Sequence, residues 1–231
     1  MNLKAISYYL SLFCFPLSIL AFINILYSSY FDYFLNINSY TITMFASLIL
    51  GIGFYFFGKI ANKKIDFIEQ LLLIILTYLT ISFLISIPYY LSNYQITFIN
   101  ALFEGFSGVT GTGFTIFNNI KYLDPTLILW RSSSQWIGGL YFLIFLILLF
   151  SNKQFTFKLN YLAHNSDGNI NSDNNVKNII LKIFLIYFGI SILIFILLTS
   201  SGVRLYNSLN LGMTLVSSGG FLPTNFLSQI I

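Results

Sequence analysis

Charged residues are scarce in this sequence, as are cysteine and histidine. Of the 231 residues only 8% are Asp, Glu, Lys or Arg, whereas 57% are hydrophobic. Soluble domains carry roughly 25% charged residues, so the composition excludes an ordinary soluble enzyme. The single cysteine, Cys14, and the single histidine, His164, exclude a disulfide framework and a metal site of the Cys/His type. The net charge of +4 favours anchoring to a membrane surface over binding of nucleic acid.

Catalytic groups are equally rare. No nucleophile, base and orienting group can be assembled from the polar residues, and no phosphate-binding loop motif occurs. A membrane-embedded enzyme would need paired acids or histidines within its spans, where only Glu104 and Arg131 are available. We therefore predict that the protein is not an enzyme and that it holds no cofactor and no resident metal ion.

Long hydrophobic runs are abundant. Each of five runs is long enough to cross a hydrocarbon core of about 30 Å as a helix. The runs lie at 5–27, 40–58, 67–91, 126–150 and 178–200. The sequence therefore predicts an all-α integral membrane protein with several spans, surrounded by the lipid bilayer.

Basic residues predict the orientation of these spans. With the N-terminus in the cytoplasm, eight basic residues fall inside and two fall outside, in agreement with the positive-inside rule. The inner set is Lys4, Lys59, Lys63, Lys64, Lys153, Lys158, Lys177 and Lys182, and the outer set is Lys121 and Arg204. We expect a multi-pass protein of the cell (inner) membrane with a cytoplasmic N-terminus.

Two segments, 92–125 and 201–231, are too broken by Gly, Thr, Ser and Asn to be full spans. Within them, 97–107 and 204–215 could each form a helix about 16–18 Å long, which is half a membrane. Irregular backbone at membrane depth is tolerated only where it is buried in protein or lines a cavity. Each segment therefore predicts a re-entrant loop. A polar stretch at 152–177, which contains the turn signal Asp167-Gly168, predicts a cytoplasmic linker.

The two re-entrant segments repeat each other at an offset of 107 residues. The offset pairs Asn100 with Asn207, Leu102 with Leu209, Gly105 with Gly212, Val109 with Val216, Gly113 with Gly220 and Phe114 with Phe221. It also carries the third apolar run onto the fifth. Internal repeats of this kind are typical of channels and transporters, in which equivalent units surround one pathway.

A half-helix that enters from outside directs its C-terminal end, with about half a negative charge, toward the bilayer centre. That end favours a cation. After the helices come Val109-Thr110-Gly111-Thr112-Gly113, the first filter segment, and Val216-Ser217-Ser218-Gly219-Gly220, the second. We expect both to be extended, with carbonyl groups that replace the hydration shell of K⁺. The alternative is that their glycines only allow close helix packing.

Glu104 lies within the first half-helix, where an ionised carboxylate needs a partner or water. It could be a vestibule charge that attracts cations, or part of an ion pair that supports the filter backbone. Arg131 is a candidate partner, and Gln135, four residues later, shares its helix face. We favour the supporting role for all three residues, because the second repeat has Leu211 in the place of Glu104.

The stretch from Ala101 to Phe114, ALFEGFSGVTGTGF, and the stretch from Leu129 to Gly139, LWRSSSQWIGG, resemble the first pore loop and the following helix of the TrkH/KtrB potassium uptake family. The resemblance implies a fold of helix, re-entrant pore loop and helix repeats, four around one pore. In those terms the chain comprises a leading hairpin (1–65), a first complete unit (66–151), the linker (152–177) and an incomplete second unit (178–231).

The resemblance also implies partners and a function. K⁺ would be the transported ion, and family members assemble as dimers that a cytosolic nucleotide-binding subunit regulates. Because the sequence stops after the second pore loop, we expect a further chain or a missing C-terminal half to supply the other units. We also expect the second loop to lack a helix that supports it. The prediction is K⁺ transport, and the alternative is a non-transporting remnant or accessory membrane subunit that only assembles with other chains.

Overall fold

The computed structural model describes residues 2–61, 65–150 and 172–224. Every regular element within these ranges is helical, as the sequence predicts. The elements are α1 (Leu3–Tyr30), α2 (Ile37–Gly58), α3 (Phe67–Tyr90), α4 (Phe98–Thr110), the 3₁₀ turn η1 (Ile120–Tyr122), α5 (Pro125–Phe150), α6 (Ser172–Ser200) and α7 (Leu205–Val216).

Five of the helices, α1, α2, α3, α5 and α6, are long and apolar enough to cross a membrane. They coincide with the five predicted runs, which confirms the prediction of an all-helical membrane protein. One boundary differs. Residues 172–177, predicted as the end of the linker, belong to α6. Most of that linker lies outside the described residues.

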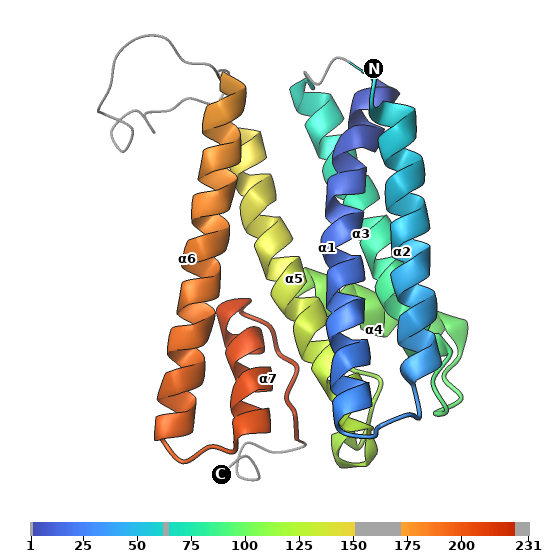
Figure 1. Ribbon diagram of the computed structural model, residues 1–231, viewed down its shortest axis with the longest axis vertical. Coiled ribbons are helices and arrows are strands. Elements are labelled where there is room, and N and C mark those ends of the chain that lie inside the picture. The colour runs from blue at the N-terminus through green and yellow to red at the C-terminus, as the bar shows by residue number, and fades with distance from the viewer. Residues whose placement is uncertain (1, 62–64, 151–171, 225–231) are drawn as a thin grey trace.

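The helices α1 and α2 form an antiparallel hairpin along one side of the bundle (Figure 1). Small residues recur every four positions on the buried face of α2, at Ser39, Thr43, Ser47 and Gly51. Such residues let two helix backbones approach closely. Because the hydrophobic effect does not drive helices together in lipid, this close van der Waals packing stabilises the pair.

The helix α5 packs against α1, α3 and α4 and also against α6 and α7, so that it joins the first part of the bundle to the last two helices. The indole nitrogen of Trp130, which is fully buried, donates to the carbonyl oxygen of Ile85 in α3 at 3.1 Å. The hydroxyl of Tyr141 donates to the carbonyl oxygen of Phe13 in α1 at 2.6 Å. These two bonds fix α5 against α3 and α1. The helix α5 also packs on both short helices, α4 and α7.

The short helices α4 and α7 begin at the same end of the bundle, the end at which α1 finishes (Figure 1). In the view of Figure 1, α7 rises to about mid-height and the chain then returns to the end from which it came. We call the residues after α4 (111–119) the first loop and those after α7 (217–224) the second loop. Both segments are re-entrant, as the repeat predicts.

Candidate functional site

The C-terminal ends of the two short helices meet at a cavity of about 320 Å³. Its described lining comprises residues 109–111 and 216–218 from those ends, Gly138 and Gly139 of α5, and the tyrosines Tyr78 and Tyr187, together with Phe142 and Leu143. None of these side chains carries a charge. The negative ends of two helix dipoles therefore act on one uncharged space, an arrangement that favours a cation.

The first filter segment differs from the predicted extended strand in its first half. Val109 and Thr110 form the last turn of α4, and the Thr110 hydroxyl donates to the carbonyl oxygen of Phe106 at 2.7 Å. The helix ends at Gly111, whose φ of 70° is the left-handed conformation that glycine adopts readily. Only residues from Thr112 onward leave the helix, so the prediction that the whole segment is extended is wrong.

The second filter segment shows the same shift. Val216 is the last residue of α7, and Ser217 follows it as the C-terminal cap with helical backbone angles. Ser218 has a φ of 55°, which is unusual for a residue other than glycine. The chain leaves the helix near Gly219 and Gly220, so that the extended part is shorter than predicted here too.

The two filter segments touch at their last glycines. A Cβ atom added to Gly113 would lie 2.5 Å from the Cα atom of Gly220, and Gly113 itself has a φ of 74°. Any other residue at Gly113 would therefore meet both backbone strain and a collision with the opposite segment. The two glycines therefore allow the two loops to approach closely, in addition to any role that their carbonyl groups have in binding an ion.

Glu104 is paired with Arg131, and both side chains are almost completely buried. The Arg131 Nε atom donates to Oε1 of Glu104 at 2.9 Å, with exposed fractions of 1% and 0% for the two side chains. The other carboxylate oxygen accepts the backbone N–H of Ile116 at 3.0 Å. The Thr115 hydroxyl donates to Oε1 at 2.9 Å. The carboxylate therefore bonds to the first loop through Thr115 and Ile116 and to α5 through Arg131.

The second loop is supported by α5, which precedes it in the chain. The Oε1 atom of Gln135 accepts the backbone N–H of Phe221 at 3.1 Å. An Nη atom of Arg131 donates to the carbonyl oxygen of Leu222 at 3.5 Å, and its guanidinium carbon lies 4.2 Å from the centre of the Phe221 ring. The expectation that this loop lacks a supporting helix is therefore wrong, because α5 supports both loops.

Gly138 and Gly139 let α5 approach the ends of the two short helices. A Cβ atom on Gly138 would lie 2.1 Å from the carbonyl oxygen of Val109, and one on Gly139 would lie 2.8 Å from the Cβ atom of Ser217. The adjacent glycines of α5 therefore contact one filter segment each.

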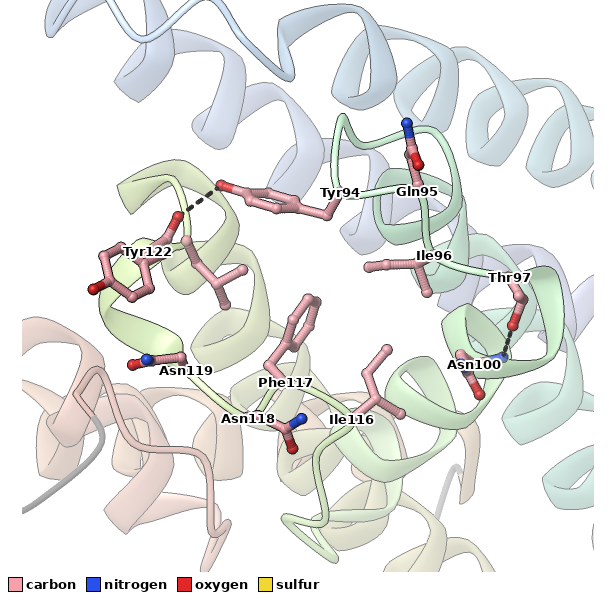
Figure 2. Close-up of a pocket in the computed structure, with 11 residues that line it drawn as sticks. Tyr94, Gln95, Ile96, Thr97, Asn100, Ile116, Phe117, Asn118, Asn119 and Tyr122 are labelled. Atoms are coloured by element: carbon pink, nitrogen blue, oxygen red, sulfur yellow. Dashed lines mark hydrogen bonds between the residues drawn. The ribbon is translucent and has the colours of Figure 1, made fainter.

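A second pocket, of about 380 Å³, lies beside the first loop. Figure 2 shows Phe117 in its middle, with Tyr94 and Tyr122 to one side and Asn100 to the other. The hydroxyl of Tyr94 donates to the carbonyl oxygen of Tyr122 at 3.3 Å, and burial raises the pKa of this hydroxyl, which stays protonated. The described lining is uncharged and rich in amide groups.

Sequence reasoning identified Glu104, Arg131 and Gln135, and the structure brings all three to the two loops. It missed Thr115, which bonds to both members of the ion pair: its hydroxyl also accepts from an Nη atom of Arg131 at 3.0 Å. It also missed Ser107, whose hydroxyl donates to the carbonyl oxygen of Phe114. The sequence signals for Ser107 are its pairing with the hydroxyl residue Thr214 in the repeat and its position three residues after Glu104 on the same helix face.

Comparison with known proteins gives consistent results. The sequence model of the TrkH family, described as cation transport proteins, matches residues 36–225. An uncharacterized cation transporter of Methanocaldococcus jannaschii is 31% identical over 186 residues, which cover 78% of this chain and 38% of that protein. The Trk system potassium uptake protein TrkI of Halomonas elongata is 40% identical over 72 residues, 31% of this chain and 15% of that protein.

The fold also matches a solved structure. The crystal structure of the potassium transporter TrkH from Vibrio parahaemolyticus superposes with a TM-score of 0.80 and 18% sequence identity. The match covers 97% of this chain and 45% of that one. The chain therefore spans less than half the length of these proteins.

Proposed function

This chain belongs to the TrkH family of cation transport proteins, and from that premise we propose that it forms part of a pathway that carries K⁺ across a membrane along backbone carbonyl groups. The relatives named as Trk potassium uptake proteins support K⁺ as the ion. Transport along such a path is not an enzymatic reaction, and K⁺ is cargo, so the proposal requires no cofactor and no resident metal ion.

One observation carries this proposal: both short helices direct their C-terminal ends at the same uncharged cavity. The last four carbonyl groups of a helix lack partners within it, so these ends present oxygen atoms as well as a negative dipole. A cation that has lost part of its hydration shell is stabilised by both. An anion would be repelled, and the described lining offers no basic group to hold it.

The proposed ion-binding backbone comprises both filter segments in a revised form. Val109, Thr110 and Val216 contribute as carbonyl groups at helix ends, because they are helical. The remaining positions, Gly111, Thr112, Gly113, Ser217, Ser218, Gly219 and Gly220, contribute as non-helical backbone or as helix caps. Glu104, Arg131 and Gln135 would hold this backbone in position rather than touch the ion.

We place the protein in the cell (inner) membrane with the N-terminus in the cytoplasm. Lys4 and Lys59 lie at the end of the bundle where α1 begins and α2 finishes, and Arg204 lies at the opposite end with the starts of α4 and α7. The positive-inside rule assigns the lysine end to the cytoplasm. Both loops then open to the outside.

Further pore units complete the proposed pathway. The chain covers 38% of the Methanocaldococcus relative and 45% of the Vibrio transporter, so such units would come from additional chain or from another subunit. Assembly as a homodimer and control by a cytosolic nucleotide-binding subunit belong to the same proposal, by analogy with the family.

The test joins this chain to the C-terminal part of the Methanocaldococcus relative and expresses the fusion in cells that lack K⁺ uptake. We expect growth at low K⁺ and uptake of Rb⁺, and we expect Gly113→Ala to abolish K⁺ selection over Na⁺. Gly53→Ala is the matched control, because a Cβ atom there has nothing within 4 Å. A fusion that reaches the membrane, folds and carries no Rb⁺ would instead support an accessory, non-transporting role.

A further inference from the structure

We propose that the second loop takes its shape from Glu104 in the first, and that Arg131 transmits this dependence as a positioning residue shared by both loops. The inference rests on the proposed function only in treating the loops as parts of one filter. Its evidence is a difference between the two repeats in how each loop is held.

The first loop is held by its own short helix. Glu104 accepts from the backbone of Ile116 and from the hydroxyl of Thr115. One turn later, Ser107 donates to the carbonyl oxygen of Phe114. Two side chains of α4 thus fix the backbone that returns past them.

The second short helix has lost both of these supports. Leu211 occupies the place of Glu104 and offers no acceptor. Thr214 occupies the place of Ser107, and its hydroxyl bonds instead to the carbonyl oxygen of Leu211 within α7, at 3.1 Å. An isolated α7 would therefore leave the returning backbone without the side-chain bonds that the first loop has.

The helix α5 replaces them. Gln135 accepts the N–H of Phe221, and Arg131 donates to the carbonyl oxygen of Leu222. The consequence is visible in the paired phenylalanines: Phe221 is 1% exposed, whereas Phe114, at the equivalent position, is 70% exposed. The second loop is packed onto α5 as a substitute for bonding to its own helix.

The guanidinium of Arg131 divides its contacts between the loops. Its Nε atom bonds to Glu104 and one Nη atom bonds to Thr115, while the other Nη atom faces Leu222. The Phe117 ring of the first loop lies 5.5 Å from its central carbon, and the Phe221 ring of the second lies 4.2 Å away. Because this planar group cannot turn toward one loop without moving relative to the other, the position that Glu104 gives it determines the contact with the second loop.

The test measures the two loops separately by cysteine labelling. In a Cys14→Ala background, Ile116→Cys reports on the first loop and Leu222→Cys on the second, and because both native side chains are half-buried, each cysteine reacts faster when its loop opens. We expect Glu104→Gln to raise the maleimide labelling rate of both reporters about tenfold, the factor that corresponds to about 1.4 kcal/mol of local stability. Gln135→Leu should raise the rate at Leu222→Cys alone.

Arg131→Lys separates charge from geometry. A lysine ammonium can still pair with Glu104, but it lacks the fork that reaches both loops. We expect near-normal labelling of the first reporter and faster labelling of the second. If Glu104→Gln accelerates labelling in the first loop and leaves the second unchanged, the two loops are independent and the proposal is wrong.

General unfolding is excluded with the native Cys14, which is fully buried and becomes reactive only when the bundle opens. If Glu104→Gln exposes Cys14, Glu104→Asp decides instead, because it keeps the charge and withdraws the carboxylate by one methylene. It must then raise labelling at Leu222→Cys, and an unchanged rate there refutes the coupling. Labelling requires no transport, so failure of the Rb⁺ uptake test leaves this result intact.

Discussion

The close contact between α5 and the end of α4 predicts opposite effects for the same substitution at two glycines. Gly138→Ala places a Cβ atom 2.1 Å from the Val109 carbonyl oxygen and 2.7 Å from its carbonyl carbon. Gly53→Ala, in α2, places one where nothing lies within 4 Å. Both changes gain up to about 1 kcal/mol of helix propensity, so the difference between them measures the collision alone.

The collision is with backbone, which cannot change rotamer to escape. Overpacking of a well-packed interior costs about 1–3 kcal/mol, and here the helices α4 and α5 must separate to relieve it. At about 2–4 °C per kcal/mol for a chain of this size, we expect the melting midpoint of Gly138→Ala to lie several degrees below that of Gly53→Ala. Labelling of the buried Cys14 during a thermal ramp in detergent gives both midpoints.

Equal midpoints for the two variants would show that α5 does not press on the end of α4, and would remove the packing argument for the first filter segment. In the fusion with further pore units, Gly138→Ala should also change the ratio of K⁺ to Na⁺ uptake, because the atom it displaces is a carbonyl oxygen of that segment. Gly53→Ala should leave this ratio as it is.

Two further predictions concern the cap of α5 and the orientation of the chain. Asp124→Ala removes the side chain that accepts the N–H of Thr126 at 3.3 Å, and loss of such a cap should lower stability by about 0.5–2 kcal/mol, measured as a lower melting midpoint, whereas Asp124→Asn should retain most of it. For orientation, a membrane-impermeant maleimide added to intact cells should label Asn118→Cys and spare Ile60→Cys, and the opposite pattern would reverse the proposed topology.

The spans could be predicted from the sequence because length and hydrophobicity alone determine what crosses a bilayer. The end of the first short helix could not, since the prediction stopped α4 at Ser107 whereas the helix continues to Thr110, although the end of α7 was predicted to within one residue. Gly108 and Gly111 have different structural roles: Gly108 is buried inside the helix, and Gly111 is the residue at which the helix ends. Gly111 has a positive φ and Gly108 does not, and this difference cannot be read from the amino-acid composition of the segment.

Like the fold, the candidate site could be predicted from the sequence only in part. Because a buried charge needs a partner, the pairing of Glu104 with Arg131 could be predicted on physical grounds alone. The contact of Gln135 with Phe221 was not predictable, because it depends on how α7 packs against a helix that lies far earlier in the chain. Sequence reasoning even led to the opposite expectation, namely that the second loop would lack a supporting helix.

The order of the two buried charges along the chain has a consequence for biosynthesis. An arginine at the centre of a spanning helix costs about 2.5–3.5 kcal/mol when the translocon releases that helix into lipid, and Arg131, the seventh residue of α5, meets part of that cost. Glu104 precedes Arg131 by 27 positions, so the carboxylate has already left the ribosome when α5 is presented to the membrane. The nascent chain can therefore insert α5 as a neutral pair with α4. A circular permutant that synthesises α5 before α4 would meet the insertion cost of the arginine without its counter-ion.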